Sequence, residues 1–167
     1  MSNETAGWHE ESPKSQCGED VKSSEGSEPR KVRGPSVGAH GQEVVTKLSP
    51  WSVGDTVTRL LAVAAAREMK VLAVIDHSGE AADVGLHLRD TKLVILGDPA
   101  AQTPVMQTAP LAALDLPFKV LVWAADDYQT RLSYTAAGEV ASRYGLSGAL
   151  VARLAGIDAL TSAAIAR

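Results

Sequence analysis

An aspartate and a histidine stand side by side at the end of the most apolar run in the chain. Residues 71–75 read Val-Leu-Ala-Val-Ile, and Asp76 and His77 follow at once. The pKa of an imidazole lies close to neutrality, so it can accept or donate a proton near pH 7, and an adjacent carboxylate can orient it. Gly97 and Asp98 follow the next apolar run in the same way. These four residues are the candidates for ligand binding or acid–base chemistry.

Each candidate also has a purely structural interpretation. Neighbouring residues on an extended strand point to opposite faces, so Asp76 and His77 form a dyad only if the strand has ended and turned. Asp76 would then cap a short helix, and His77 would bond a backbone carbonyl. Gly97-Asp98-Pro99 lacks the further glycines and the lysine of a phosphate-binding loop, and its carboxylate would repel an anion. Asp98 fits better as a helix N-cap, with Pro99 in the first turn.

Other kinds of reactive site have little support. Beyond residue 42 the histidines are His77 and His87, and no close pair of histidines or cysteines gives a zinc-binding spacing. The single cysteine, Cys17, lies near the N-terminus, and no Gly-x-Ser-x-Gly nucleophile motif occurs. The sequence therefore implies no metal and points to no particular cofactor.

Composition divides the 167 residues into two parts. Residues 1–42 hold few apolar residues, scattered without period among Ser, Gly, Glu, Lys and Pro, and are predicted to be a disordered tail. Residues 43–167 are apolar enough for a single globular domain with one core. The formal net charge of −4 is shared evenly by the two parts, so neither offers the basic surface typical of nucleic-acid binding.

The sequence shows no feature of export or membrane insertion. The N-terminus has no basic start followed by an apolar run, so we expect no secretory signal. No apolar stretch approaches the roughly 18 residues of a membrane helix. A lone cysteine allows no internal disulfide. We therefore expect a soluble cytoplasmic protein without a membrane partner.

The first half of the predicted domain reads as strand, helix, strand. Residues 44–49 are short and β-prone, and Ser52 then begins a helix that runs to about residue 68, with Asp55 completing a capping box. The nearly apolar run 70–76 predicts a strand that is buried on both faces or central in the sheet.

The second half adds three strands and further helices. Two helical turns broken at Gly85 lead to a strand over 91–97, and a second short helical stretch follows Pro99. Residues 118–134 predict a hairpin. A short helix then ends at Gly145, and Ser147 is expected to cap one last amphipathic helix.

This order suits an α+β fold. We expect a two-layer sandwich with a mostly antiparallel sheet of about five strands and two long helices on one face. A doubly wound parallel fold would need a long helix between successive strands.

The relative direction of two strands also decides whether two of the candidate residues can lie close together. If 71–76 and 91–97 are antiparallel neighbours, His77 and Asp98 lie at opposite ends; if they are parallel, the two residues share one edge.

Six ordered blocks of the sequence resemble the domain of unknown function 302 family. They are SPWSVGDTVTRLL, AVIDHSGEAADVGLHL, TKLVILGDP, PVM, LDLPFKVLVW and SYTAAGEVASRYGL, and they lie within residues 48–165, the part of the chain that the resemblance covers. The resemblance implies a fold similar to the TATA-binding-protein type and no established reaction. There are two departures from the family pattern. Glu68-Met69-Lys70 stands where members often carry glycine, and Gly97-Asp98-Pro99 stands where they often have Gly-Asn-Pro.

Three functions are compatible with the sequence. The first is a small binding or sensing domain, expected to be a homodimer, that takes a small-molecule ligand at Asp76, His77, Gly97 and Asp98. The second is an enzyme that uses His77 as general acid or base, with Asp76 or Asp98 holding its tautomer. The third is a structural or protein-interaction module.

Overall fold

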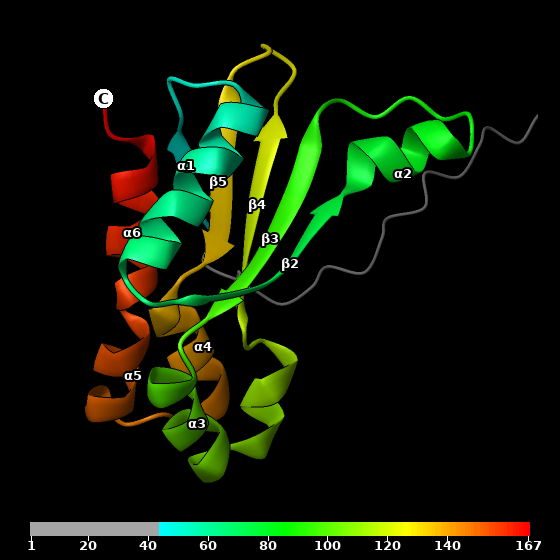
Figure 1. Ribbon diagram of the computed structural model, residues 1–167. Coiled ribbons are helices and arrows are strands. Elements are labelled where there is room, and N and C mark those ends of the chain that lie inside the picture. Colours follow the sequence, from blue (N-terminus) through cyan, green and yellow to red (C-terminus); the bar gives the residue numbers. More distant parts are fainter. Residues whose placement is uncertain (1–43) are drawn as a thin grey trace, which may run out of the picture. The chain divides into compact units, whose positions relative to one another are not determined.

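The structure, a computed structural model, describes residues 44–167. The predicted disordered tail, residues 1–42, lies outside this range. The elements follow in the order β1 (Val44–Leu48), α1 (Val53–Ala66), β2 (Lys70–Asp76), α2 (His77–Asp83), β3 (Thr91–Gly97), α3 (Pro99–Thr108), the 3-10 helix η1 (Pro110–Leu114), β4 (Phe118–Ala124), β5 (Thr130–Thr135), α4 (Ala137–Tyr144), α5 (Gly148–Leu154) and α6 (Gly156–Ile165) (Figure 1).

The strands form one sheet in the order β1-β5-β4-β3-β2. Every neighbouring pair is antiparallel. The helices α1 and α6 pack against each other on one face of this sheet (Figure 1). The predicted α+β two-layer architecture is therefore confirmed.

The core lies between the sheet and these two helices. Period-two alternation in the strands and helical spacing in α1 and α6 turn one set of apolar side chains inward. The largest of them are fully buried, among them Leu60, Leu96, Leu132 and Leu160, each 0% exposed. The shorter helices α3, α4 and α5 contact one another or η1, beyond one end of the sheet (Figure 1).

The C-terminal helical run corrects the expectation that no apolar stretch reaches membrane length. By length and composition, Gly148–Ile165 is long and apolar enough to cross a membrane, with a hydropathy of 1.4. In the domain this run is interrupted at Ala155, between α5 and α6, and Leu154, Ile157 and Leu160 are buried in the core. A helix that packs on a core needs apolar side chains too, which accounts for the buried 28% of this run.

Side chains cap several helices where the sequence predicted it. Ser52 Oγ accepts the backbone N–H of Asp55 at 3.0 Å and donates to the Asp55 carboxylate at 2.7 Å. The Asp76 and Asp98 carboxylates cap α2 and α3 by accepting the backbone N–H groups of Gly79 and Ala100. Ser147 precedes α5 but makes no capping hydrogen bond, so its predicted role as a side-chain cap is wrong.

The end of α1 places a glutamate in a conformation that favours glycine. The Met69 N–H donates to the Ala64 carbonyl at 3.0 Å and the Glu68 N–H to the Ala65 carbonyl at 3.1 Å, the Schellman pattern of many helix ends. Glu68 consequently has a φ of 56°, a region in which a β-carbon is strained. It lies in the segment where the sequence departs from the glycine of the resembled family.

Replacing Glu68 with glycine should therefore stabilise the domain. Glycine avoids the strain of the left-handed conformation, about 1–2 kcal/mol. Its greater conformational entropy in the unfolded chain lowers the stability by about 0.4–1 kcal/mol. We expect a net gain of about 0.5–1 kcal/mol in the free energy of unfolding, measured by urea denaturation. Glu68→Ala keeps the β-carbon and is the control. Equal stability of the two variants would contradict the strain argument.

The strand β2 lies at the edge of the sheet, which corrects the prediction of a central or doubly buried strand. Within residues 44–167 no strand pairs with its outer side. Val71, Leu72 and Val74 are 36%, 51% and 44% exposed. The register shifts between Val71 and Ala73, and such bulges are common at sheet edges. The apolar composition of β2 is thus not explained by contacts inside the described chain.

Candidate functional site

The antiparallel pairing of β2 and β3 separates the four candidate residues into two places. Asp76 pairs with Lys92 at one end of the two strands, and Lys70 pairs with Gly97 at the other. The six-residue interval, at about 3.3 Å per residue, sets these ends roughly 20 Å apart. A hydrogen-bonded pair needs about 2.6–3.2 Å between heavy atoms. Within one chain, Asp98 therefore cannot orient His77.

Asp76 has structural partners at its end of the sheet. Its carboxylate pairs with the Lys92 ammonium, accepts the Ser78 hydroxyl at 2.6 Å and accepts the Gly79 N–H at 2.9 Å. These partners, Lys92 first, hold the pKa of Asp76 far below its ordinary value. A carboxylate that is this acidic is a weak general base near neutral pH. The geometry supports the capping interpretation of Asp76.

His77 is the first residue of α2 and is exposed. The hydrogen bonds found within residues 44–167 include none from its imidazole, so the expected bond to a backbone carbonyl is not made there. The exposed imidazole is therefore accessible to a ligand or to another protein chain.

The variant His77→Gln should accordingly leave the fold unaffected. An exposed side chain without a packing or hydrogen-bonding role changes the free energy of unfolding by no more than about 0.5 kcal/mol. Urea denaturation of the two proteins side by side measures the difference. A loss above about 1 kcal/mol would show that the imidazole has a buried partner.

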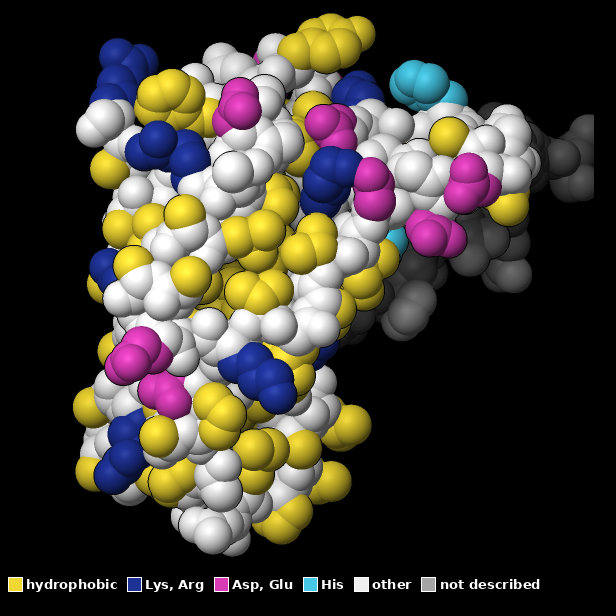
Figure 2. Space-filling view, in the orientation of Figure 1, with side chains coloured by type: hydrophobic (Ala, Val, Ile, Leu, Met, Phe, Trp, Pro, Cys, Tyr) yellow, Lys and Arg dark blue, Asp and Glu magenta, His cyan; other side chains and the backbone are white. Residues whose placement is uncertain are grey.

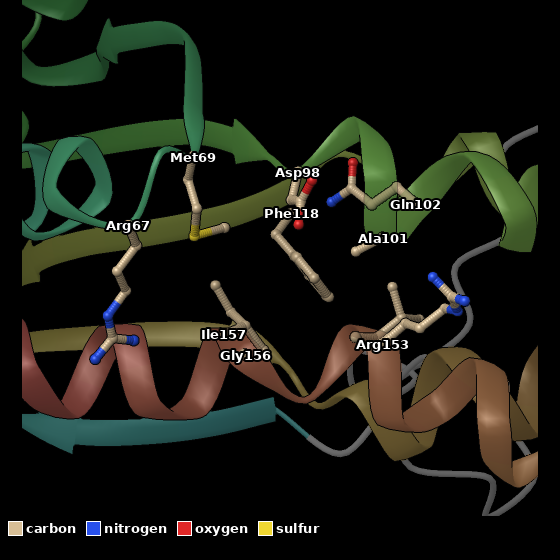
Figure 3. A pocket seen from close by; sticks show the side chains of 10 residues that line it. Arg67, Met69, Asp98, Ala101, Gln102, Phe118, Arg153, Gly156 and Ile157 are labelled. Carbon is tan, nitrogen blue, oxygen red and sulfur yellow. The ribbon is translucent and has the colours of Figure 1, made fainter.

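The opposite end of β3 borders a small cavity of about 190 Å³. Asp98 lies at its edge and caps α3 by accepting the Ala100 N–H at 2.8 Å. Apolar side chains form most of the wall (Figure 3). The complete lining is Arg67, Met69, Asp98, Ala101, Gln102, Phe118, Arg153, Leu154, Gly156 and Ile157.

Gln102 gives this cavity its chemical character. The residue is 4% exposed, and its amide nitrogen Nε2 is buried with no hydrogen-bond partner in the described chain. An unsatisfied buried donor costs about 1–3 kcal/mol and is rare in folded proteins. Figure 3 shows the Gln102 side chain beside Asp98 at one end of the cavity. The comparable buried atom in residues 44–167, Trp51 Nε1, does not line this cavity.

The glycine at position 97 makes room for this amide. A β-carbon on Gly97 would lie 2.5 Å from Gln102 Oε1 and 3.1 Å from its Cδ, closer than van der Waals contact permits. Gly97 is itself buried. Of the Gly97-Asp98 pair that the sequence singled out, Asp98 lines the cavity and caps the helix that carries Gln102. Gly97 lies behind the wall and accommodates the Gln102 amide.

Two guanidinium groups lie on either side of the apolar wall. Arg67 follows α1 and Arg153 belongs to α5, and both side chains are exposed (Figure 3). Neither forms a salt bridge with another residue in the 44–167 range. The site combines an apolar floor, one buried amide donor, one carboxylate and two exposed positive charges.

Two other cavities have walls with fewer features that suit a specific ligand. A wider one of about 640 Å³ lies where the loop before β3 meets the β4–β5 turn and is lined largely by exposed residues, His87 among them. Another of about 250 Å³ lies against Tyr134 and Asp158 and is mostly apolar. Among residues 44–167, no group of three or more His, Cys, Asp or Glu side chains could hold a metal ion.

Sequence reasoning missed Gln102, Arg67 and Arg153. They come from three helical segments that are far apart in the chain, and no spacing between them could show that they converge. The available signal was a glutamine close behind the Asp98 cap on a short helix of low amphipathicity. That pattern is ordinary for an exposed residue.

Together these features define a small α+β domain, with an antiparallel sheet covered by paired helices and a cavity at one end. The chain belongs to the family described as "Domain of unknown function DUF302", whose family model matches residues 45–164. This confirms the resemblance seen in the sequence. The crystal structure of an uncharacterized conserved DUF302 protein from Bacillus stearothermophilus shares the fold, with a TM-score of 0.62 and 17% identity over 73% of this chain and 94% of that chain.

Part of the chain is also similar to curated proteins of known class. The fluoride-specific ion channel FluC 1 of Brucella suis biovar 1 is 34% identical over 103 residues, which are 62% of this chain and 41% of that protein. The FluC 1 protein of Brucella abortus biovar 1 is 34% identical over 103 residues, or 62% of this chain and 38% of that protein. The match thus spans about two fifths of the length of these relatives.

Proposed function

We propose that this domain binds a small molecule in the cavity beside Gln102. The observation that carries the proposal is the Gln102 Nε2 group, a buried donor of the cavity-lining Gln102 side chain for which residues 44–167 supply no hydrogen-bond partner. Because Nε2 is buried, the Gln102 side chain would rotate toward the cavity to meet a ligand acceptor, and the new hydrogen bond would recover the free energy that the unsatisfied group costs. Asp98 belongs to this site and Gly97 makes room for Gln102 behind it, whereas Asp76 and His77 of the same chain do not line the cavity.

The walls favour a small monocarboxylate. A volume of about 190 Å³ corresponds to roughly six water molecules at about 30 Å³ each, so the ligand has a short apolar body. Arg67 and Arg153 are within the lining and suit an anionic head group. The Asp98 carboxylate repels any anion, but it repels a singly charged carboxylate less than a phosphate of higher charge.

Catalysis has less support than binding. The Asp76 carboxylate is fully engaged with Lys92, Ser78 and Gly79, and His77 has no orienting partner among the described residues of its own chain. We therefore favour a binding or sensing role, exercised in the cytoplasm, over an acid–base enzyme that uses His77.

A titration of the full chain with acetate, butyrate and benzoate tests the proposal. Amide NMR shifts of residues around the cavity should saturate with at least one of these ligands. Ala101→Trp fills the cavity and should abolish the shifts, whereas Ala100→Trp changes the exposed neighbour on the same helix and should preserve them. Absence of saturable binding in the unmodified protein, or equal binding by both variants, would overturn the proposal.

The similarity to fluoride-specific ion channel proteins favours a second candidate, a domain that works together with fluoride transport. An amide N–H and two guanidinium groups are chemically suited to a small anion. Sodium fluoride is the appropriate probe, with sodium chloride at equal ionic strength as the control. Saturable shifts at Gln102 with fluoride alone would favour this candidate, and identical responses to both salts would remove it.

A further inference from the structure

The outer edge of β2 continues into an apolar segment that contacts little of the domain. We define the arm as residues 77–90, which comprise α2 and the stretch that joins it to β3. No residue of α2 is buried, and Val84, Leu86 and Leu88 are 71%, 67% and 45% exposed. Figure 1 shows the arm projecting beyond β2 and β3, away from the helices that cover the sheet. An exposed apolar edge joined to an exposed apolar arm marks an interaction surface.

We infer that a second copy of this chain occupies this surface, with the two β2 strands paired antiparallel about a two-fold axis near their middle. Pairing one edge with its own copy closes the assembly at two subunits. It also satisfies the outward N–H and C=O groups of both strands and covers their side chains. The run 70–76, which the sequence predicts to be a central or fully buried strand, would then be a central strand of the sheet that the dimer forms.

The charges at the two ends of β2 are self-complementary. Arg67 and Lys70 lie at its start, with Glu68 between them, and Glu80 and Asp83 lie on the arm beyond its end. All five are exposed, and Figure 2 shows acidic side chains gathered over the arm. Antiparallel self-pairing sets the net basic end of one copy beside the acidic arm of the other, whereas a parallel arrangement would place like charges together.

The same pairing reunites the candidate residues that one chain separates. Lys70 is the neighbour of Gly97 in the sheet. Asp76 and His77 of one copy would therefore lie about two strand spacings, roughly 10 Å, from the partner's Gly97, compared with roughly 20 Å within a chain. His77 and the base of the arm then stand beside the mouth of the partner's cavity. This completion of the cavity rests on the proposed function, whereas the dimer does not.

Light scattering of the full chain after size exclusion tests the dimer. We expect twice the chain mass of 17.5 kDa. Leu72→Lys places a charge on the β2 edge and should yield a folded monomer. Leu48→Lys changes a residue of similar exposure on the opposite edge strand, 59% against 51%, and should remain dimeric. A monomeric unmodified chain, or a dimer that only Leu48→Lys disrupts, would overturn the inference and point to another occupant of the β2 edge.

Cross-linking tests the shared cavity. In a Cys17→Ser background, a Lys70→Cys copy is mixed with a His77→Cys copy and treated with a short bis-maleimide. Both positions are exposed, and a covalent heterodimer is expected. The pair Leu48→Cys and His77→Cys is the control and should not link. A dimer without the Lys70–His77 link would overturn the shared cavity, whatever the carboxylate titration shows. A linked dimer that binds no carboxylate would instead contradict the proposed function alone.

Discussion

Replacing Gln102 with methionine is expected to make the domain more stable and unable to bind its ligand. Methionine is unbranched, close to glutamine in volume and free of hydrogen-bonding groups, so it fits the same space. It removes the buried Nε2 donor that has no partner in the described chain. We expect the free energy of unfolding to rise by about 1–3 kcal/mol in urea denaturation. The carboxylate titration should lose its saturable shifts in the same protein.

The matched control lies on the same helix. Gln107 is exposed, so Gln107→Met should change the free energy of unfolding by less than about 0.5 kcal/mol and leave binding intact. A residue that is retained at a cost to stability is expected where it serves a function. A destabilised Gln102→Met protein would show that the fold itself needs the amide, and it would remove the main argument for the site.

Lys47→Met is expected to cost about 1.5–3 kcal/mol of unfolding free energy, because charged hydrogen bonds are lost. The Lys47 ammonium donates to Asp158 Oδ1 at 2.8 Å, to Thr161 Oγ1 at 3.1 Å and to Ser162 Oγ at 2.8 Å. These contacts tie the edge strand β1 to α6 across the layer boundary. Methionine keeps the apolar stem, so urea denaturation reports mainly the loss of the ammonium group. A change below about 0.5 kcal/mol would show that the cluster is replaceable by water.

The same cluster should make stability depend on acid pH. The Lys47 ammonium, and the Tyr134 hydroxyl at 2.5 Å, lower the pKa of Asp158 from its ordinary value of 3.8. A carboxyl pKa that folding lowers contributes stability above the unfolded value, and this contribution is lost as pH falls through the folded value. Asp158→Asn should therefore be less stable than the unmodified protein at pH 7, with the difference shrinking below pH 3.8.

Urea denaturation at pH 7, 5 and 3 measures this dependence, and Asp83→Asn, an exposed carboxylate on the arm, is the control. The control should follow the unmodified protein at every pH. A difference between Asp158→Asn and the unmodified protein that stays constant down to pH 3 would contradict the lowered pKa.

Local chemistry is what the sequence determined by itself. Ser52, Asp76 and Asp98 were predicted as caps and make those hydrogen bonds. A cap needs only a side-chain acceptor within three residues of the N–H groups that it satisfies. The strand over 91–97 and the hairpin were predicted for the same reason, because alternation and turn residues are also local. The order of the helices and strands then predicted the two-layer α+β architecture.

Long-range pairing is what only the tertiary structure decided. Nothing local in the run 70–76 distinguishes a central strand from an edge strand, because burial depends on which segments lie beside it. The antiparallel register of β2 and β3 separated His77 from Asp98. Gln102 became a candidate only when the fold placed its amide against Gly97 and in one cavity wall with Phe118 and Ile157. A cavity is defined by residues that the fold brings together, and its chemistry emerges only once their mutual distances are set.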